Sequence, residues 1–160
     1  MRRQPPVGGS LTTVVTNVSE QVTILVVSPL DEDHLALQDI IGNSNYSTWI
    51  LFSARDLVSA LALLQQHEIV VVVCEQDLQP GTWKDVLEKI NGISNAPSLI
   101  VTSRLADWHL WAEALNLGAW DVLAKPFDLS EVIRSIQSAS RRWHDQIHML
   151  LTLKKLWAAS

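Results

Sequence analysis

Three polar side chains stand at or just beyond the ends of short apolar runs: Lys125, Glu75 and Thr102. If these runs are parallel strands, their carboxyl ends form the sheet edge at which ligands bind in α/β proteins. Glu75 and Lys125 would then form a partly desolvated ion pair. Loss of either partner would leave the other charge uncompensated, at a cost of about 3 kcal/mol or more.

The elements that must position these residues follow an alternating order along the chain. Apolar runs that predict buried parallel strands span 22–27, 49–52, 69–74, 99–102 and 120–124, and amphipathic helical patterns follow them. Four pairs indicate helix starts, a capping residue with an acid three positions later: Ser28 and Asp31, Ser53 and Asp56, Thr82 and Asp85, Asp128 and Glu131. This order predicts a doubly wound five-stranded parallel α/β sheet of flavodoxin-like (βα)5 type, with an extended C-terminal helix.

The segment from Gly118 to Lys125 and Pro126 resembles the response-regulator receiver domain. In that family, a lysine fixed by a following proline contacts an aspartyl phosphate beside a magnesium ion. The resemblance covers about residues 22–139 and implies that Thr102 matches the hydroxyl residue that holds a phosphoryl oxygen. It also implies a signalling protein of a bacterial two-component phosphorelay pathway, with a protein partner and no enzymatic activity.

The phosphoacceptor position is ambiguous in this sequence. The family places its aspartate after the third strand, typically four residues before a proline. Counting back from Pro80 selects Gln76, whereas counting outward from the run 69–74 selects Glu75. We favour Glu75, which is the first residue free to face the edge, and expect Asp77 to lie in the following loop. A glutamate would hold a permanent negative charge near the phosphoryl position and could imitate the modified state.

A metal ion is not expected at this edge. Ser28 and Pro29 occupy the positions where the family has an acidic pair. Asp31, Glu32 and Asp33 follow, but three residues along a helix is about 4.5 Å. We therefore expect these acids to complement the helix dipole, with Ser28 as the cap and Pro29 at the first helical position. Without magnesium, acceptor activity should be all but lost, so we expect no cofactor and no catalytic residue.

The residue expected to signal phosphorylation also differs from the family pattern. Val122 stands three residues before the lysine, where the family commonly has an aromatic switch residue, and a branched aliphatic side chain has no ring to swing. Trp120 is expected on the same side of its strand as Val122. Together with Trp108 and Trp111 on the fourth helix, and with Trp143 on the final helix, it predicts an interaction surface.

The final helical pattern outruns the domain. Apolar or small residues recur with mostly three-four spacing at Val132, Ile136, Ala139, Trp143, Ile147, Leu150, Leu153 and Trp157. We expect a disordered leader over 1–20, a receiver-like domain over 21–140 and a helical extension over 141–160. The extension predicts a homodimer through the fourth helix, fifth strand and final helix, with a parallel two-stranded coiled coil. Folding back onto the domain is the other hypothesis.

Composition restricts the compartment and the partners. The chain of 160 residues is 48% hydrophobic, and its longest apolar run is far shorter than the ~20 residues that cross a bilayer. We expect a cytoplasmic protein with no membrane partner. The single Cys74 excludes an internal disulfide. The cations after residue 140 are sparser than the basic stripe of a nucleic-acid reader, so we expect no nucleic-acid partner.

Two other functions remain open from the sequence alone. The chain could be a phosphorylatable receiver, with Asp77 as the acceptor and Asp31 or Asp33 bringing the ion. It could also be a flavodoxin-like domain that binds a small ligand at the same edge.

Overall fold

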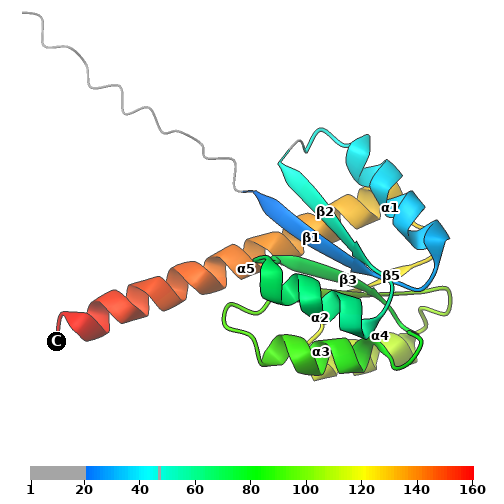
Figure 1. Ribbon diagram of the computed structural model, residues 1–160. Helices are drawn as coiled ribbons and strands as arrows, with labels where there is room; N and C mark the ends of the chain where they lie inside the picture. The colour runs from blue at the N-terminus through cyan, green and yellow to red at the C-terminus, as the bar shows by residue number, and fades with distance from the viewer. Residues whose placement is uncertain (1–20, 47) are drawn as a thin grey trace, which may run out of the picture.

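The computed structural model describes residues 21–46 and 48–160, so the predicted leader over 1–20 lies outside the described residues. Strands and helices alternate as predicted (Figure 1): β1 Val22–Val27, α1 Asp31–Gly42, β2 Trp49–Ala54, α2 Leu57–Gln66, β3 Val71–Glu75, α3 Trp83–Asn91, β4 Ser98–Ser103, α4 Trp108–Leu117, β5 Asp121–Ala124 and α5 Leu129–Ala158. The five strands form one parallel sheet in the order β2-β1-β3-β4-β5. The predicted flavodoxin-like fold is confirmed.

Two apolar cores cover the two faces of the sheet. Side chains of α2, α3 and α4 pack on one face, with Trp83 among the largest that are fully buried. Side chains of α1 and of the first half of α5 pack on the other face, around Ile24 and Ile136. Because the strand order reverses direction at β1 and β3, the crevice at their carboxyl ends is the place where such sheets carry their sites.

Two of the predicted helix starts are found in the structure. Thr82 and Asp85 form a capping box at α3, and Asp128 accepts hydrogen bonds from the first amides of α5. The start predicted at Ser53 is wrong, because Ser53 lies inside β2 and Asp56 caps α2. The start predicted at Ser28 is also wrong.

Helix α1 begins later than the pattern at Ser28 and Pro29 suggested. The cap position is Leu30, which has an extended backbone and no side-chain cap, so Pro29 lies outside the helix. The hydroxyl of Ser28 accepts a hydrogen bond from the Leu30 amide and donates one to Asp33. The first turn of α1 therefore starts at Asp31, three residues after Ser28.

Helix α5 is one continuous helix that projects far beyond the sheet (Figure 1). Its buried residues end at Trp143, whereas Trp157 near its end is 84% exposed. The helix does not fold back onto the domain, so that hypothesis is wrong. None of the helices over the described ranges has the length and apolar character needed to span a membrane.

Candidate functional site

The carboxyl ends of β1, β3, β4 and β5 bring the candidate residues to one edge. Glu75 is the last residue of β3 and pairs in register with Thr102 of β4. Lys125 directly follows β5, and its amide donates to the carbonyl of Ser103 at the end of β4. Parallel pairing thus fixes the three backbone positions before any side chain is considered.

Lys125 bonds two buried carboxylates at once. Its Nζ lies 2.5 Å from Glu75 Oε2 and 3.0 and 2.9 Å from the two carboxylate oxygens of Asp33. The three side chains are only 6%, 11% and 5% exposed, respectively. An ammonium with two carboxylates therefore makes a buried cluster with a formal charge of minus one.

Hydroxyl groups complete the bonding of both carboxylates. Thr102 Oγ1 donates to Glu75 Oε2 over 3.1 Å, and Ser28 Oγ donates to Asp33 Oδ2 over 2.7 Å. His34, which is buried behind Ser28, has its Nε2 2.8 Å from the Ser28 carbonyl oxygen. Charged groups at this depth are tolerated only when they are paired and hydrogen-bonded, and these groups are.

The electrostatics favour the charged form of Lys125. Burial alone would lower the pKa of its ammonium group. The hydrogen bonds and charges of Glu75 and Asp33 outweigh that effect, so the pKa of Lys125 lies above its ordinary value. The Lys125 ammonium is therefore charged at neutral pH.

The expected role of Asp33, to complement the dipole of its helix, is incomplete. Asp33 does lie in the first turn of α1, as expected, but it is buried against Lys125 and does more than complement the helix dipole. A helix that started at Pro29 would have displaced Asp33 along its axis, but α1 starts two residues later. Because α1 starts at Asp31, Asp33 is only the third helical residue, and its side chain reaches Lys125 at the sheet edge. The expectation of a single carboxylate at this edge is thus corrected to two.

The other two acceptor candidates lie outside this cluster. The backbone N–H of Gln76 donates to the Thr102 carbonyl oxygen, and the side-chain oxygen of Gln76 accepts from Ser103 Oγ over 2.7 Å. Asp77 is exposed in the loop and forms an isolated β-bridge with Thr82. Pro80 follows Glu75 by five residues and Gln76 by four, and of these two residues Glu75 is the one that bonds Lys125.

The acidic groups do not fit a magnesium ion in this arrangement. Magnesium requires near-octahedral oxygen ligands at about 2.1 Å. Here Asp33 uses both oxygens, and Glu75 uses Oε2, to bond the Lys125 ammonium, which occupies the position between the carboxylates. Over residues 21–46 and 48–160, no three His, Cys, Asp or Glu side chains gather as metal ligands do.

A second ion pair lies at the mouth of the site. Arg104, which follows β4, bonds Glu32 on the first turn of α1, and both side chains are exposed. These two residues line a cavity of about 370 Å³ together with Asp33, Ala36, Lys125, Pro126 and Phe127. Asp33 and Lys125 of the buried cluster therefore border the same cavity as this exposed ion pair.

The residues predicted for readout occupy different environments. Val122 is buried in the core beneath α4, whereas Trp120 packs against the opposite core and over Arg142 of α5. The prediction that they share one side is wrong, because Trp120 precedes β5 and strand alternation does not govern it. Trp143 is also wrong as a surface residue. It is buried, and its indole nitrogen donates to the carbonyl of Asn95.

Trp108 and Trp111 do lie at the surface of α4. They are 72% and 40% exposed, and Leu105 and Leu115 beside them are exposed as well. Their role as an interaction surface stays a prediction.

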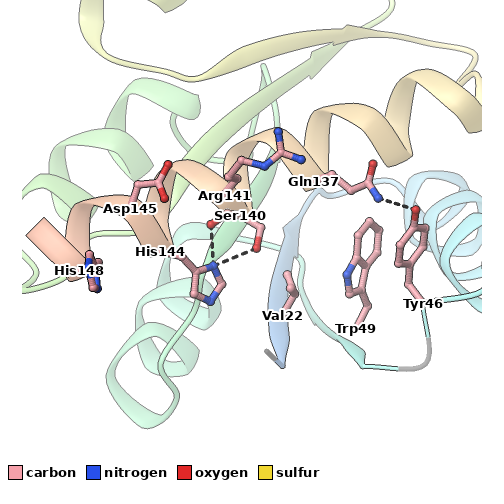
Figure 2. A pocket seen from close by; sticks show the side chains of 9 residues that line it. All are labelled: Val22, Tyr46, Trp49, Gln137, Ser140, Arg141, His144, Asp145 and His148. Atoms are coloured by element: carbon pink, nitrogen blue, oxygen red, sulfur yellow. Dashed lines mark hydrogen bonds between the residues drawn. The ribbon is translucent and has the colours of Figure 1, made fainter. Parts of the chain in front are cut away.

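A larger cavity of about 470 Å³ lies at the opposite edge of the sheet (Figure 2), where Val22 and Trp49 begin β1 and β2. Tyr46 stacks on Trp49 with 4.5 Å between ring centres, and Gln137 of α5 donates to the Tyr46 hydroxyl. These contacts fix α5 against the start of β2. The cavity is separate from the cluster around Lys125.

The family model for the response regulator receiver domain matches residues 24–137. Among curated proteins, the probable transcriptional regulatory protein TcrX of Mycobacterium tuberculosis is 30% identical over 125 residues, which are 77% of this chain and 51% of TcrX. The transcriptional regulatory protein KdpE of the same species is 26% identical over 121 residues, covering 76% and 52%. The chain thus spans about half the length of these curated relatives.

Solved structures give the same result. A signal receiver domain of an HD domain-containing protein from Pseudomonas fluorescens Pf-5 has a TM-score of 0.74 and 25% identity, covering 84% of this chain and 98% of that one. The receiver domain of a LuxO repressor protein from Vibrio parahaemolyticus has a TM-score of 0.73 over 81% and 97% of the two chains. At 16% identity, it supports the fold alone.

Proposed function

The chain belongs to the response regulator receiver domain family of two-component signalling, and we propose that it signals without accepting a phosphoryl group. On this proposal, it acts as a protein-interaction and self-association module. The observation that carries the proposal is the double salt bridge of Lys125 to Glu75 and Asp33. The lysine that would contact a phosphoryl group in this family already has its anionic partners.

Glu75 has the acceptor's place in this proposal. Its Oε2 accepts from both Thr102 and Lys125, so the two groups expected to hold a phosphoryl oxygen hold the glutamate itself. Phosphoryl transfer depends on positioning and on metal neutralisation of the phosphate. Because the ammonium occupies the space between the carboxylates, neither requirement is supplied, and the site is held in one charged arrangement.

Output would then depend on surfaces rather than on a modified residue. The exposed patch of Leu105, Trp108, Trp111 and Leu115 on and before α4 is the surface we assign to a protein partner. We assign self-association to α5. Of the three elements expected to form the dimer surface, the fourth helix, the fifth strand and the final helix, this proposal keeps the final helix alone. The relatives named above are transcriptional regulators, which makes a transcriptional output one concrete form of this role.

Incubation of the full chain with acetyl phosphate and magnesium, followed by intact-mass spectrometry, tests the proposal. We expect no added phosphoryl mass in the wild type. The matched control is Asp77→Asn, which should behave identically. A phosphoryl adduct that Asp77→Asn abolishes would establish the alternative, a phosphorylatable receiver with an exposed acceptor in the loop. An adduct that survives in Asp77→Asn and is lost in Glu75→Gln would overturn the inert role of Glu75.

A further inference from the structure

The projecting part of α5, residues 144–158, carries a large apolar surface that its own domain does not cover (Figure 1). Six large side chains there are about half or more exposed: Met149, Leu150, Leu151, Leu153, Leu156 and Trp157. Full burial of such a side chain contributes about 1.5–3 kcal/mol. A helical segment of this length is only marginally stable alone in water, so a covering surface is expected.

Five apolar residues of α5 are arranged symmetrically about Leu150. Ile147 and Leu153 lie three residues to either side of it, and Trp143 and Trp157 lie seven residues to either side. At 100° per residue, all five fall on one side of the helix with Leu150 at the middle of the stripe. Such a stripe complements a copy of itself that runs in the opposite direction.

A hollow lies at one end of this stripe. The cavity, of about 300 Å³, is bounded by Asn95 and Ala96 of the loop before β4 and by five residues of α5: Trp143, Gln146, Ile147, Met149 and Leu150. The hydrogen bond from Trp143 Nε1 to the Asn95 carbonyl, 3.0 Å long, fixes one wall. The other end of the stripe carries Trp157, the most exposed of the large apolar side chains. The segment therefore has a knob at one end and a matching apolar hollow at the other.

We propose that two copies of this chain pair through antiparallel α5 segments, with the symmetry axis at Leu150 and Trp157 of each copy in the hollow beside Trp143 of the other. Seven residues of helix span about 10.5 Å, so a two-fold axis at Leu150 brings residue 157 level with residue 143 of the second copy. A parallel coiled coil would set the two Trp157 side chains together and leave both hollows open. It would also place the two Lys154 ammonium groups at one level, whereas the antiparallel pair sets Lys154 opposite Gln146.

This inference rests on the self-association in the proposed function and is independent of whether the site accepts a phosphoryl group. Sedimentation equilibrium on the full chain tests the association. We expect a dimer at tens of micromolar and at least a tenfold weaker dimer for Trp157→Ala. Trp108→Ala, which removes another exposed tryptophan from α4, is the matched control and should leave the dimer unchanged. A monomeric wild type, or an equal loss in Trp108→Ala, would overturn the proposal.

Cysteine cross-linking tests the orientation. The native Cys74 is buried, and burial, followed by the charge of Glu75, raises the pKa of its thiol, so it should not interfere. A mixture of Gln146→Cys and Lys154→Cys chains should give cross-linked pairs of one with the other, and Trp157→Cys alone should not cross-link. Self-linked Trp157→Cys would show a parallel coiled coil instead.

Binding of a monomeric wild type to anionic vesicles would make a lipid surface the occupant. Intact-mass measurement of the same samples after acetyl phosphate treatment separates the two proposals. A failed cross-link without a phosphoryl adduct would count against the antiparallel dimer alone, whereas an adduct would count against the phosphorylation-independent role.

Discussion

Lys125 decides what the site can do, because among residues 21–46 and 48–160 it is the one cation bonded to two buried carboxylates. In an isolated buried pair, desolvation can cancel most of the attraction, so the pair itself is weak support for stability. The cost of removing one partner is different. Without Lys125, Asp33 and Glu75 would face each other as buried like charges, with only Ser28 and Thr102 as donors.

Replacement of Lys125 by methionine should therefore destabilise the domain strongly. We expect a loss of about 3 kcal/mol or more in the free energy of unfolding, since an uncompensated buried charge remains. Urea denaturation followed by circular dichroism measures it. Lys84→Met is the control, because Lys84 pairs with Glu113 at an exposed position and should cost under about 1 kcal/mol. Equal effects in the two variants would show that the Lys125 cluster is not desolvated.

The raised pKa of the same lysine predicts how the stability of the domain depends on pH. Its pKa is raised above the ordinary 10.5 in the folded chain, because Glu75 and Asp33 outweigh the effect of burial. A raised folded-state pKa adds stability that is fully present below the unfolded value and is lost as pH rises through the folded value. The stability gap between wild type and Lys125→Met should thus persist from pH 7 to about 10 and close above that range. Urea midpoints of both proteins across this range measure it, and a gap that closes below pH 9 would contradict the raised pKa.

At the scale of elements, the loop between β3 and α3 holds the end of the site strand in place. Gly81 in this loop has a φ of +92°, and a Cβ there would lie 2.7 Å from Asp85 Oδ2. That same oxygen accepts the hydrogen bond from the Thr82 amide in the capping box of α3. A side chain at position 81 would therefore strain the backbone and displace the cap together.

We predict that Gly81→Ala lowers the free energy of unfolding by about 1–2 kcal/mol, from the backbone strain and the weakened cap. Thermal and urea denaturation measure the change. Gly42→Ala is the matched control. Gly42 is the last residue of α1, nothing lies within 4 Å of the Cβ that alanine would add, and alanine favours a helix. The control should be neutral or stabilising, and an equally destabilising Gly42→Ala would remove the argument from loop geometry.

The elements were predictable because buried parallel strands are unbroken apolar runs, and β1 matches its run from Val22 to Val27. Residues at strand ends were predictable for the same reason, which is why Glu75, Thr102 and Lys125 could be proposed together. Asp33 could not, because its position depends on where α1 begins. Ser28 and Pro29 match a helix start equally well, and only the bonds of the Ser28 hydroxyl distinguish the two cases. Burial of Trp143 likewise depends on the loop at Asn95, which lies 48 residues away.

At the scale of the whole molecule, the buried cluster and the projecting helix are close neighbours along the chain. Only the segment 126–128 separates Lys125 from the start of α5, and α5 then crosses the sheet and leaves it as one helix (Figure 1). The first half of α5 is fixed by the core around Ile136 and by the Gln137 contact with Tyr46. The orientation of the exposed half is thus set by the domain, and a second copy meets a preformed surface.

Association through that surface should make thermal stability depend on protein concentration. A dimer of folded chains is stabilised by mass action. Above its Kd the free monomer rises as the square root of the total concentration, so each tenfold increase adds about 0.7 kcal/mol per chain. For a domain of this size, that corresponds to a rise of about 1–3 °C in Tm. Leu150→Glu would place two charges at the proposed symmetry axis and should abolish the dependence. Leu105→Glu, at the exposed position before α4, should retain it. Calorimetric scans from about 2 to 200 μM measure both variants. A concentration dependence that survives Leu150→Glu but disappears in Leu105→Glu would move the self-association surface from α5 to α4.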